Sequence, residues 1–156
     1  MHSRVHITFV CTGNICRSPM AEVVFADALR SAGLDDRVRV SSAGTGDWHV
    51  GDPADPRTEA TLRRAGYDVK HVAAQVGPEH LCADLLVALD SGHLAELRRM
   101  VRNPDRLVLL RSFDPAAQGD LDVPDPYFGG TRGFDDVLAM VQAAVPGLLT
   151  WVRERL

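Results

Sequence analysis

Short apolar runs alternate with helical patterns along most of this chain. Four runs rich in β-branched and other apolar residues predict buried strands, at about 6–10, 38–42, 85–89 and 107–110. Apolar residues recur at helical spacing in three intervening stretches, at 19–32, 57–65 and 91–101. This alternation predicts an α/β fold, in which a doubly wound parallel four-stranded sheet carries helices on both faces.

A longer helical pattern follows near the end of the chain, where apolar residues from Phe134 to Val152 lie three and four positions apart. Pro146 falls inside this pattern. Proline has no backbone N–H to donate, and its ring clashes with the preceding turn. We therefore expect Pro146 to kink this helix or to split it in two.

Composition and charge narrow the class of protein. With 156 residues, 46% of them hydrophobic and 24% charged, the chain has the balance of one globular domain spanning residues 1–156. A net charge of −4 without a basic block argues against nucleic-acid binding. No stretch approaches membrane-spanning length and no signal-peptide pattern opens the chain, so we expect no membrane partner. We also expect a monomer.

The cysteines indicate the redox state of the protein's compartment, and the histidines indicate whether a metal site is expected. Two of the three cysteines, Cys11 and Cys16, lie in one short segment, which indicates a reducing cytoplasm rather than a disulfide framework. Cys82 precedes an apolar run, and we expect it in the core. The six histidines show no metal-ligand spacing, so neither a metal nor a cofactor is predicted.

Residues 11–18, called the 11–18 loop below, join the first predicted strand to the first predicted helix. They place Cys11 at one end and Arg17 near the other, and Pro19 suits the first turn of the helix. A loop in this position gathers backbone N–H groups and the positive end of the helix dipole, which favours a phosphate-like anion. Gly13 would let the backbone turn an N–H inward without steric cost. The sequence therefore predicts a sulfur nucleophile at the floor of an anion-binding loop.

Such a loop suits nucleophilic chemistry on phosphate esters. A thiol attacks as the thiolate, and only about 3% of a free cysteine is ionised at neutral pH, so complete ionisation gains only about 1.5 orders of magnitude in rate. Phosphate-ester hydrolysis is among the slowest uncatalysed reactions, so most of the acceleration must come from stabilising charge on the phosphoryl oxygens. Arg17 suits that task because its planar fork donates two parallel hydrogen bonds.

The string Cys-Thr-Gly-Asn-Ile-Cys-Arg-Ser-Pro-Met-Ala-Glu, residues 11–22, resembles the active-site loop of the low-molecular-weight protein tyrosine phosphatase family. Three further segments are similar to that family and come in its order, at 42–45, 71–73 and 125–127. The resemblance covers about residues 5–149. It implies a single phosphatase domain that hydrolyses protein phosphotyrosine and small aryl phosphates through a phosphocysteine intermediate. Tyrosine-phosphorylated proteins would be its partners and phosphate its product.

Asp125 is the candidate proton donor. Pro124 and Pro126 stiffen its backbone on both sides, and a carboxylic acid can protonate a leaving oxygen and then deprotonate a water. The resemblance implies the same role, since Asp125 matches the family's general acid. On local sequence alone a turn aspartate is the alternative. Asp122 is the local competitor and Asp120 a weaker one.

A set of residues is expected to bind substrate or to support the loop. The substrate-binding members are Thr12, Gly13, Asn14, Ile15, Cys16, Ser18, Trp48, His49, Tyr127 and Phe128. The resemblance implies that the Asn14 side chain holds the shape of the loop, that Ser42 helps to anchor it and that His71 joins its hydrogen-bond network. Ser18 can cap the helix, donate toward the sulfur, or both. For His71 ordinary packing is the alternative.

Side chains on neighbouring loops predict the walls of the site. Trp48, His49, Tyr127 and Phe128 would enclose a deep slot, which favours phosphotyrosine because only the longer group reaches the sulfur. Ordinary packing is the alternative for Trp48 and Phe128. Ile15 is typical of the tyrosine-directed members, whereas related protein-arginine phosphatases carry threonine at the matching position.

Three other interpretations stay open at this point. Thiol-dependent arsenate reductases share the fold but relay electrons through two further cysteines, and this chain has only Cys82 outside the loop. A protein-arginine phosphatase and a non-catalytic phosphate-binding module are the others. The resemblance also implies a reversible disulfide between Cys11 and Cys16, although a purely structural Cys16 fits the sequence nearly as well.

Overall fold

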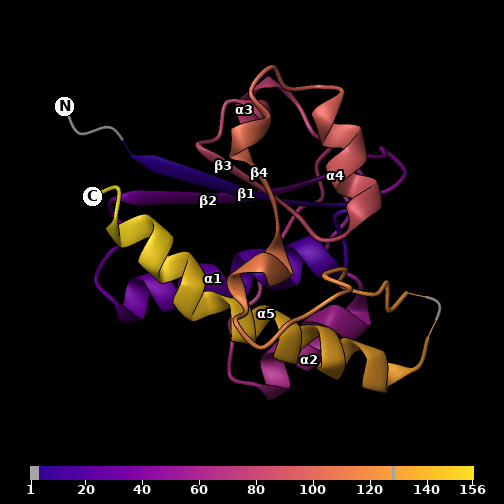
Figure 1. Cartoon of the computed structure of the whole chain (residues 1–156). Helices are drawn as coiled ribbons and strands as arrows, with labels where there is room; N and C mark the ends of the chain where they lie inside the picture. Colours follow the sequence, from indigo (N-terminus) through magenta and orange to yellow (C-terminus); the bar gives the residue numbers. More distant parts are fainter. Residues whose placement is uncertain (1–3, 128) are drawn as a thin grey trace.

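The computed structural model describes residues 4–127 and 129–156, and Figure 1 shows a sheet with helices on both sides of it. Within these ranges four strands lie in the order β2-β1-β3-β4, and each pairs in parallel with its neighbours. The strands are β1 (Val5–Cys11), β2 (Val38–Gly44), β3 (Leu85–Ala88) and β4 (Leu107–Leu109). The predicted parallel sheet of four strands is confirmed.

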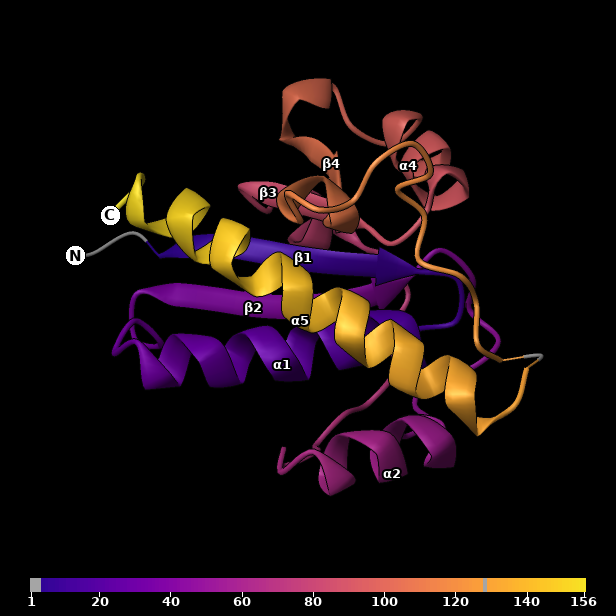
Figure 2. The same cartoon turned by 60° about the horizontal axis from the view of Figure 1, so that its bottom comes forward.

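The helices of the described ranges are α1 (Arg17–Ser31), α2 (Pro56–Arg64), α3 (Pro78–Leu81), α4 (Ser91–Arg98), α5 (Thr131–Arg153), and the 3₁₀ helices η1 (Pro104–Arg106) and η2 (Leu110–Phe113). Figure 2 shows α1 and α5 on one face of the sheet with α2 beside them, and α4 on the other face. Periodicity missed α3, η1 and η2 because three or four residues are too few to show a helical repeat. None of the described helices is long and apolar enough to cross a membrane.

The central strand β1 is buried on both faces, so its side chains alternate between two apolar layers. Ile7 and Phe9 pack with α1 and α5, where the Phe9 and Phe25 rings meet edge to face with centroids 6.1 Å apart. Val10 lies on the other face and packs with Leu97 of α4. Burial of one such side chain stabilises the fold by about 1.5–3 kcal/mol, so β1 forms a firmly held centre.

The end of β1 lies where the direction of the strand order reverses. From β1 the chain passes through α1 to β2 on one side of it, while β3 pairs with its other side. Cys11, the last residue of β1, pairs with Gly44 at the end of β2. Open parallel sheets bind their ligands at this kind of position, beyond the carboxyl ends of the strands. The fold therefore presents the 11–18 loop at the usual ligand-binding edge.

The prediction that Pro146 would split the last helix is wrong, because α5 runs as one helix from Thr131 to Arg153. Pro146 lies on the exposed side of α5, where water can bond to the carbonyl that the missing N–H leaves unpaired. Val141 and Leu148, on either side of the proline, are buried in the same core. This shared burial keeps both halves of the helix against the sheet.

The prediction that Cys82 lies in the core is also wrong, because its side chain is exposed at the end of α3. The apolar run that follows does form the buried strand β3, but the core begins one residue later, at Ala83. The turn that ends α3 points Cys82 outward.

We expect Gly147→Ala to destabilise the protein, although alanine favours a helix over glycine by about 1 kcal/mol. A Cβ at Gly147 would lie 2.5 Å from the carbonyl oxygen of Phe113 in η2. The clash should lower the free energy of unfolding in urea by about 1–3 kcal/mol. Gly133→Ala in the same helix is the control, because its Cβ would meet Pro126 at an ordinary 3.5 Å. An unchanged or raised stability of Gly147→Ala would contradict the close packing of α5 on η2.

Candidate active site

The two ends of the 11–18 loop carry the sulfur and the guanidinium that the sequence singled out. Cys11 is the last residue of β1 and Arg17 the first residue of α1, and both are only 3% exposed. The Cys11 Sγ lies 2.9 Å from the Ser18 Oγ. The Asn14 Nδ2 donates to the same Ser18 oxygen at 2.7 Å, so the Ser18 hydroxyl keeps its own hydrogen for the sulfur. A hydrogen bond of this kind stabilises a thiolate.

The backbone of the loop turns at Asn14, which adopts a left-handed conformation with φ of 57°. Asparagine tolerates this region better than most residues, and here its side chain is fully buried and fully used. Its Nδ2 also donates to the Ser42 Oγ at 2.9 Å, and its Oδ1 accepts from the Ala74 N–H at 3.0 Å. The His71 Nε2 donates to the Asn14 carbonyl oxygen at 2.6 Å. Ser42 and His71 thus meet at Asn14, beneath the loop.

Glu22 of α1 completes this buried network, a role that the sequence did not suggest. The Ser42 hydroxyl donates to the Glu22 Oε1 at 2.5 Å, and the His71 Nδ1 lies 3.8 Å from the same oxygen. Burial raises the pKa of Glu22, while Ser42 and His71 oppose the shift. The Glu22 carboxyl thus connects α1 to Ser42 and His71, the two residues that contact Asn14 of the loop.

Asp90 orients the Arg17 guanidinium. The Arg17 Nη1 donates to the Asp90 Oδ2 and to the Val123 carbonyl oxygen, both at 2.8 Å. Although burial disfavours its charge, the His93 backbone N–H and the Arg17 guanidinium hold the pKa of Asp90 below its usual range. Sequence reasoning missed Asp90; the available signal was an Asp-Ser-Gly sequence directly after a buried strand, which is typical of a helix N-cap.

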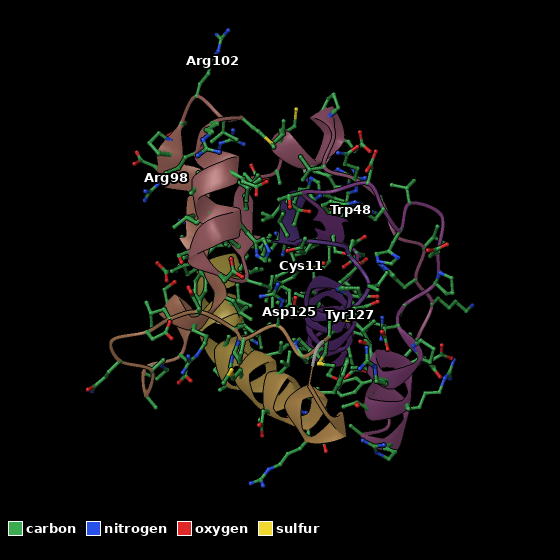
Figure 3. The ribbon with its side chains drawn as sticks, turned by 90° about the vertical axis from the view of Figure 1, so that its right-hand side faces the viewer. Cys11, Trp48, Arg98, Arg102, Asp125 and Tyr127 are labelled. Atoms are coloured by element: carbon green, nitrogen blue, oxygen red, sulfur yellow. The ribbon has the colours of Figure 1, made fainter. Side chains whose placement is uncertain are left out.

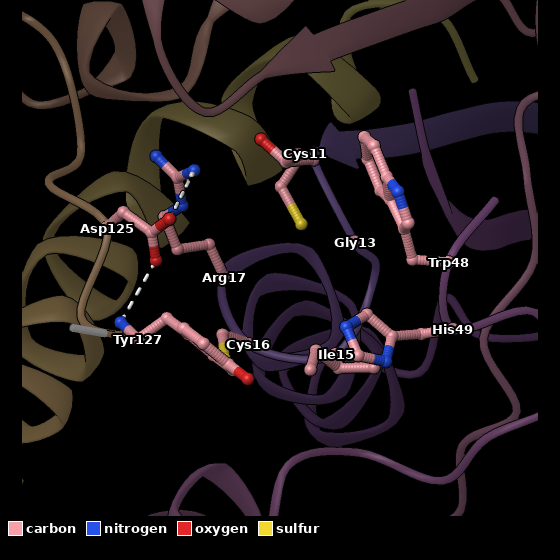
Figure 4. Close-up of a pocket in the computed structure, with 10 residues that line it drawn as sticks. Cys11, Gly13, Ile15, Cys16, Arg17, Trp48, His49, Asp125 and Tyr127 are labelled. Carbon is pink, nitrogen blue, oxygen red and sulfur yellow. Dashed lines mark hydrogen bonds and ion pairs between the residues drawn. The ribbon is translucent and has the colours of Figure 1, made fainter. Parts of the chain in front are cut away.

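Asp125 faces the same cavity as Cys11 and Arg17, as Figure 4 shows. Its Oδ1 accepts from the Tyr127 N–H at 3.0 Å, and its Oδ2 lies 3.7 Å from the Arg17 Nη2. Its competitors lie elsewhere: Asp122 accepts from the Ser91 N–H at 2.8 Å at the start of α4, and the Asp120 Oδ1 accepts from the Asp122 N–H at 2.9 Å. Neither of these two carboxylates lines the cavity.

The cavity has a volume of about 200 Å³. Four of the residues that line it, Cys11, Trp48, Asp125 and Tyr127, are labelled in Figure 3. Its lining residues are Cys11, Thr12, Gly13, Ile15, Cys16, Arg17, Trp48, His49, Asp125 and Tyr127. Asn14 and Ser18, which the sequence grouped with the substrate-binding residues, are fully buried and do not line the cavity; their side chains bond to each other inside the loop instead. Phe128 lies outside the described residues.

Glycines leave room for the side chains on one wall of the cavity, and a residue of α2 supports the opposite wall. A Cβ at Gly46 would lie 1.8 Å from the Trp48 ring, and one at Gly13 would lie 3.0 Å from the His49 Cδ2. Trp48 is 73% exposed, so it forms a rim rather than part of the core. On the opposite side Arg57 of α2 donates to the Tyr127 carbonyl oxygen at 3.1 Å, and its guanidinium carbon lies 5.3 Å from the centre of the Tyr127 ring. Arg57 is a third supporting residue, after Glu22 and Asp90, that the sequence did not reveal.

Cys16 lines the cavity with Cys11, and both thiols are free. Burial, with Asp55 nearby, raises the pKa of Cys16 to about 12. Cys16 is therefore a protonated thiol at neutral pH. Within residues 4–127 and 129–156, no three His, Cys, Asp or Glu side chains form a group that could hold a metal ion.

Comparison with known proteins agrees with this arrangement. The model of the family described as low molecular weight phosphotyrosine protein phosphatase matches residues 6–156. The low molecular weight protein-tyrosine phosphatase A of Mycobacterium tuberculosis is 57% identical over 100% of this chain and 96% of its own length. A low molecular weight protein-tyrosine-phosphatase of Streptomyces coelicolor is 56% identical over 96% of this chain and 94% of its own. The crystal structure of YfkJ from Bacillus subtilis superposes with a TM-score of 0.91 at 34% identity, covering 98% of this chain and 97% of that one. The chain therefore belongs to the low molecular weight protein tyrosine phosphatase family.

Proposed function

We propose that this phosphatase hydrolyses phosphotyrosine in proteins, and small aryl phosphates, with Cys11, Arg17 and Asp125 as its catalytic residues. The observation that carries the proposal is that the sulfur and the guanidinium of the 11–18 loop line one cavity with a carboxyl from a distant segment. A nucleophile, an oxyanion clamp and a proton donor are the three groups that metal-independent phosphoryl transfer requires.

In the first step the Cys11 sulfur attacks phosphorus, so that an S–P bond forms while the P–O bond to the tyrosine oxygen breaks. The Ser18 hydroxyl at 2.9 Å stabilises the negative sulfur before attack. Arg17 and the backbone N–H groups of the 11–18 loop hold the three equatorial oxygens, where charge accumulates in the transition state. Because Asp90 already fixes the guanidinium, little reorganisation is needed when the phosphoryl group arrives.

Asp125 supplies the proton for the departing phenolate and later removes one from water. Its Oδ1 is held by the Tyr127 N–H, which leaves Oδ2 on the side of Arg17 and the bound phosphoryl group. In the second step this water attacks phosphorus, the S–P bond breaks, and free phosphate leaves with Cys11 restored as the thiolate. One carboxyl can therefore serve both steps.

The shape of the cavity supports an aryl phosphate as substrate. Cys11 lies at its floor, while Trp48 and His49 stand on one side and Tyr127 on the other (Figure 4). A phenyl ring is long enough to fill the space between these walls, and its flat faces can contact the side chains on either side. Ile15 also lines the cavity and gives the ring an apolar contact. We propose tyrosine-phosphorylated proteins as the partners on this basis.

Replacing Cys11 with serine should abolish turnover, since a hydroxyl is a far poorer nucleophile than a thiolate at neutral pH. We expect kcat/KM for 4-nitrophenyl phosphate to fall by about 10⁴-fold or more. Cys82→Ser is the matched control, because Cys82 is exposed and lies outside the cavity, and it should retain the wild-type value. A kcat/KM of the Cys11→Ser enzyme within about tenfold of the wild-type value would disprove the role of the sulfur.

Asp125→Asn should slow turnover in proportion to the need for a proton on the leaving oxygen. For phenyl phosphate, a poor leaving group, we expect a loss in kcat/KM of about 10²–10⁴-fold, and for 4-nitrophenyl phosphate a much smaller one. Asp122→Asn is the control: it removes the charge and one of the two acceptor oxygens at the start of α4, and its effect should not depend on the leaving group. Equal losses for both esters in Asp125→Asn would argue against its role as general acid.

Peptides that differ only in the phosphorylated residue test the substrate class. We expect a phosphotyrosine peptide to be hydrolysed at least about 100-fold faster, in kcat/KM, than matched phosphoserine and phosphoarginine peptides. The reason is that only the phenyl ring fills the space between the walls. Phosphate release measured on the three peptides gives the ratio, and a preference for phosphoarginine would replace the proposed substrate class.

A further inference from the structure

A buried histidine of α4 contacts the 11–18 loop beside the nucleophile. His93 is 4% exposed, and its Nε2 lies 2.8 Å from the Thr12 Oγ1, on the residue next to Cys11. Neither the loop sequence nor the catalytic steps above assign any task to this contact. A hydrogen bond of that length between a buried ring and a cavity-lining residue requires a physical account.

The other side of the same ring faces the carboxylate that orients Arg17. The His93 Nδ1 lies 3.2 Å from the Asp90 Oδ1, and the Asp90 Oδ2 accepts from the Arg17 Nη1 at 2.8 Å. Thr12 and Arg17 stand at opposite ends of the loop, yet both are attached to the first turn of α4. The chain of contacts Thr12, His93, Asp90, Arg17 therefore closes across the base of the cavity.

The protonation state of the His93 ring determines which of its nitrogens donates a hydrogen bond and which accepts one. Burial lowers the pKa of His93 to about 4; Arg17 acts in the same direction, and Asp90, Asp125 and Asp122 oppose it. A neutral ring carries one hydrogen, and the Asp90 carboxylate attracts it to Nδ1. Within the described part of the chain, His93 Nδ1 has no partner with hydrogen-bond geometry, so its interaction with the Asp90 carboxylate is electrostatic. Nε2 is then an acceptor, and the Thr12 hydroxyl donates to it.

The opposite side of Thr12 is held by backbone alone. Its carbonyl oxygen accepts from the Gly46 N–H at 3.0 Å, and a Cβ at Gly44 would lie only 2.6 Å from that oxygen. Among the residues that the structure describes, His93 is thus the one side chain that forms a hydrogen bond with the Thr12 hydroxyl. Without it the two peptide units that flank Thr12 would be held by backbone hydrogen bonds alone, from the Thr45 N–H to the Cys11 carbonyl oxygen at 2.9 Å and from the Gly46 N–H to that of Thr12.

We propose that His93 is a positioning residue for phosphoryl transfer. It holds Thr12 at the start of the loop and, through Asp90, keeps the loop and the Arg17 guanidinium in one fixed geometry around the bound phosphoryl oxygens. This inference rests on the proposed function, because it assigns His93 to the same catalytic site.

Three variants separate the hydrogen bond from the volume of the ring. His93→Leu fills the space without a polar atom, His93→Gln restores a polar group at the reach of Nε2, and Thr12→Val removes only the hydroxyl. We expect His93→Leu and Thr12→Val each to lower kcat/KM for 4-nitrophenyl phosphate by about 10–100-fold and to weaken inhibition by inorganic phosphate. His93→Gln should recover most of the loss.

The double variant His93→Leu/Thr12→Val tests whether both residues act through one contact. Its loss should not exceed that of the worse single variant, because each change removes the same interaction. The ratio of kcat/KM between phenyl and 4-nitrophenyl phosphate should stay at the wild-type value, since Asp125 is untouched. A purely structural effect would lower thermal stability without changing inhibition by phosphate.

His80→Leu is the matched control, since His80 is also a buried histidine but lies in α3 away from the cavity. It should lower the melting temperature and leave kcat/KM unchanged. Wild-type kcat/KM in His93→Leu and Thr12→Val, or losses that multiply in the double variant, would overturn the proposal. Turnover by the wild-type enzyme tests the proposed function, whereas the ratio of each variant to wild type tests this inference.

Discussion

Burying the charge of Arg17 is the constraint on which the rest of the site depends. A guanidinium that is 3% exposed loses most of its hydration, and an unpaired buried charge costs several kcal/mol. The structure compensates with the Asp90 carboxylate and the Val123 carbonyl oxygen. Asp90 comes from the end of β3 and Val123 from the segment that leads to Asp125. Pairing one cation therefore brings three distant parts of the chain to the same place, and Asp125 is carried there with them.

A second buried group, Asn14, gives the loop its shape. Its left-handed backbone directs the chain around the sulfur, and its amide satisfies Ser18, Ser42 and the Ala74 N–H at once. Because these partners belong to α1, β2 and the segment after α2, the loop cannot relax without disturbing the core. The geometry of the loop is in this way built into the folded state before any ligand arrives.

Local patterns were enough to predict the sheet, its longer helices and the position of Cys11 and Arg17 in one loop, because these features arise from periodicity or from residues close in the sequence. Contacts such as Arg17 with Asp90, or Thr12 with His93, join residues 73 and 81 positions apart and leave no local trace. The prediction that Pro146 would split the last helix failed for a related reason. Burial of residues on both sides of the proline outweighs a local helix-breaking preference, and this tertiary packing is not visible in the sequence around it.

The high pKa of Cys16 has an electrostatic consequence for the ligand. Two sulfurs line one small cavity, and if both were ionised they would repel a phosphate dianion as well as each other. With its pKa raised to about 12, Cys16 stays neutral, and Cys11 alone can carry a negative sulfur. The burial of one thiol thus keeps a second negative charge away from the place that a doubly charged phosphoryl group would occupy.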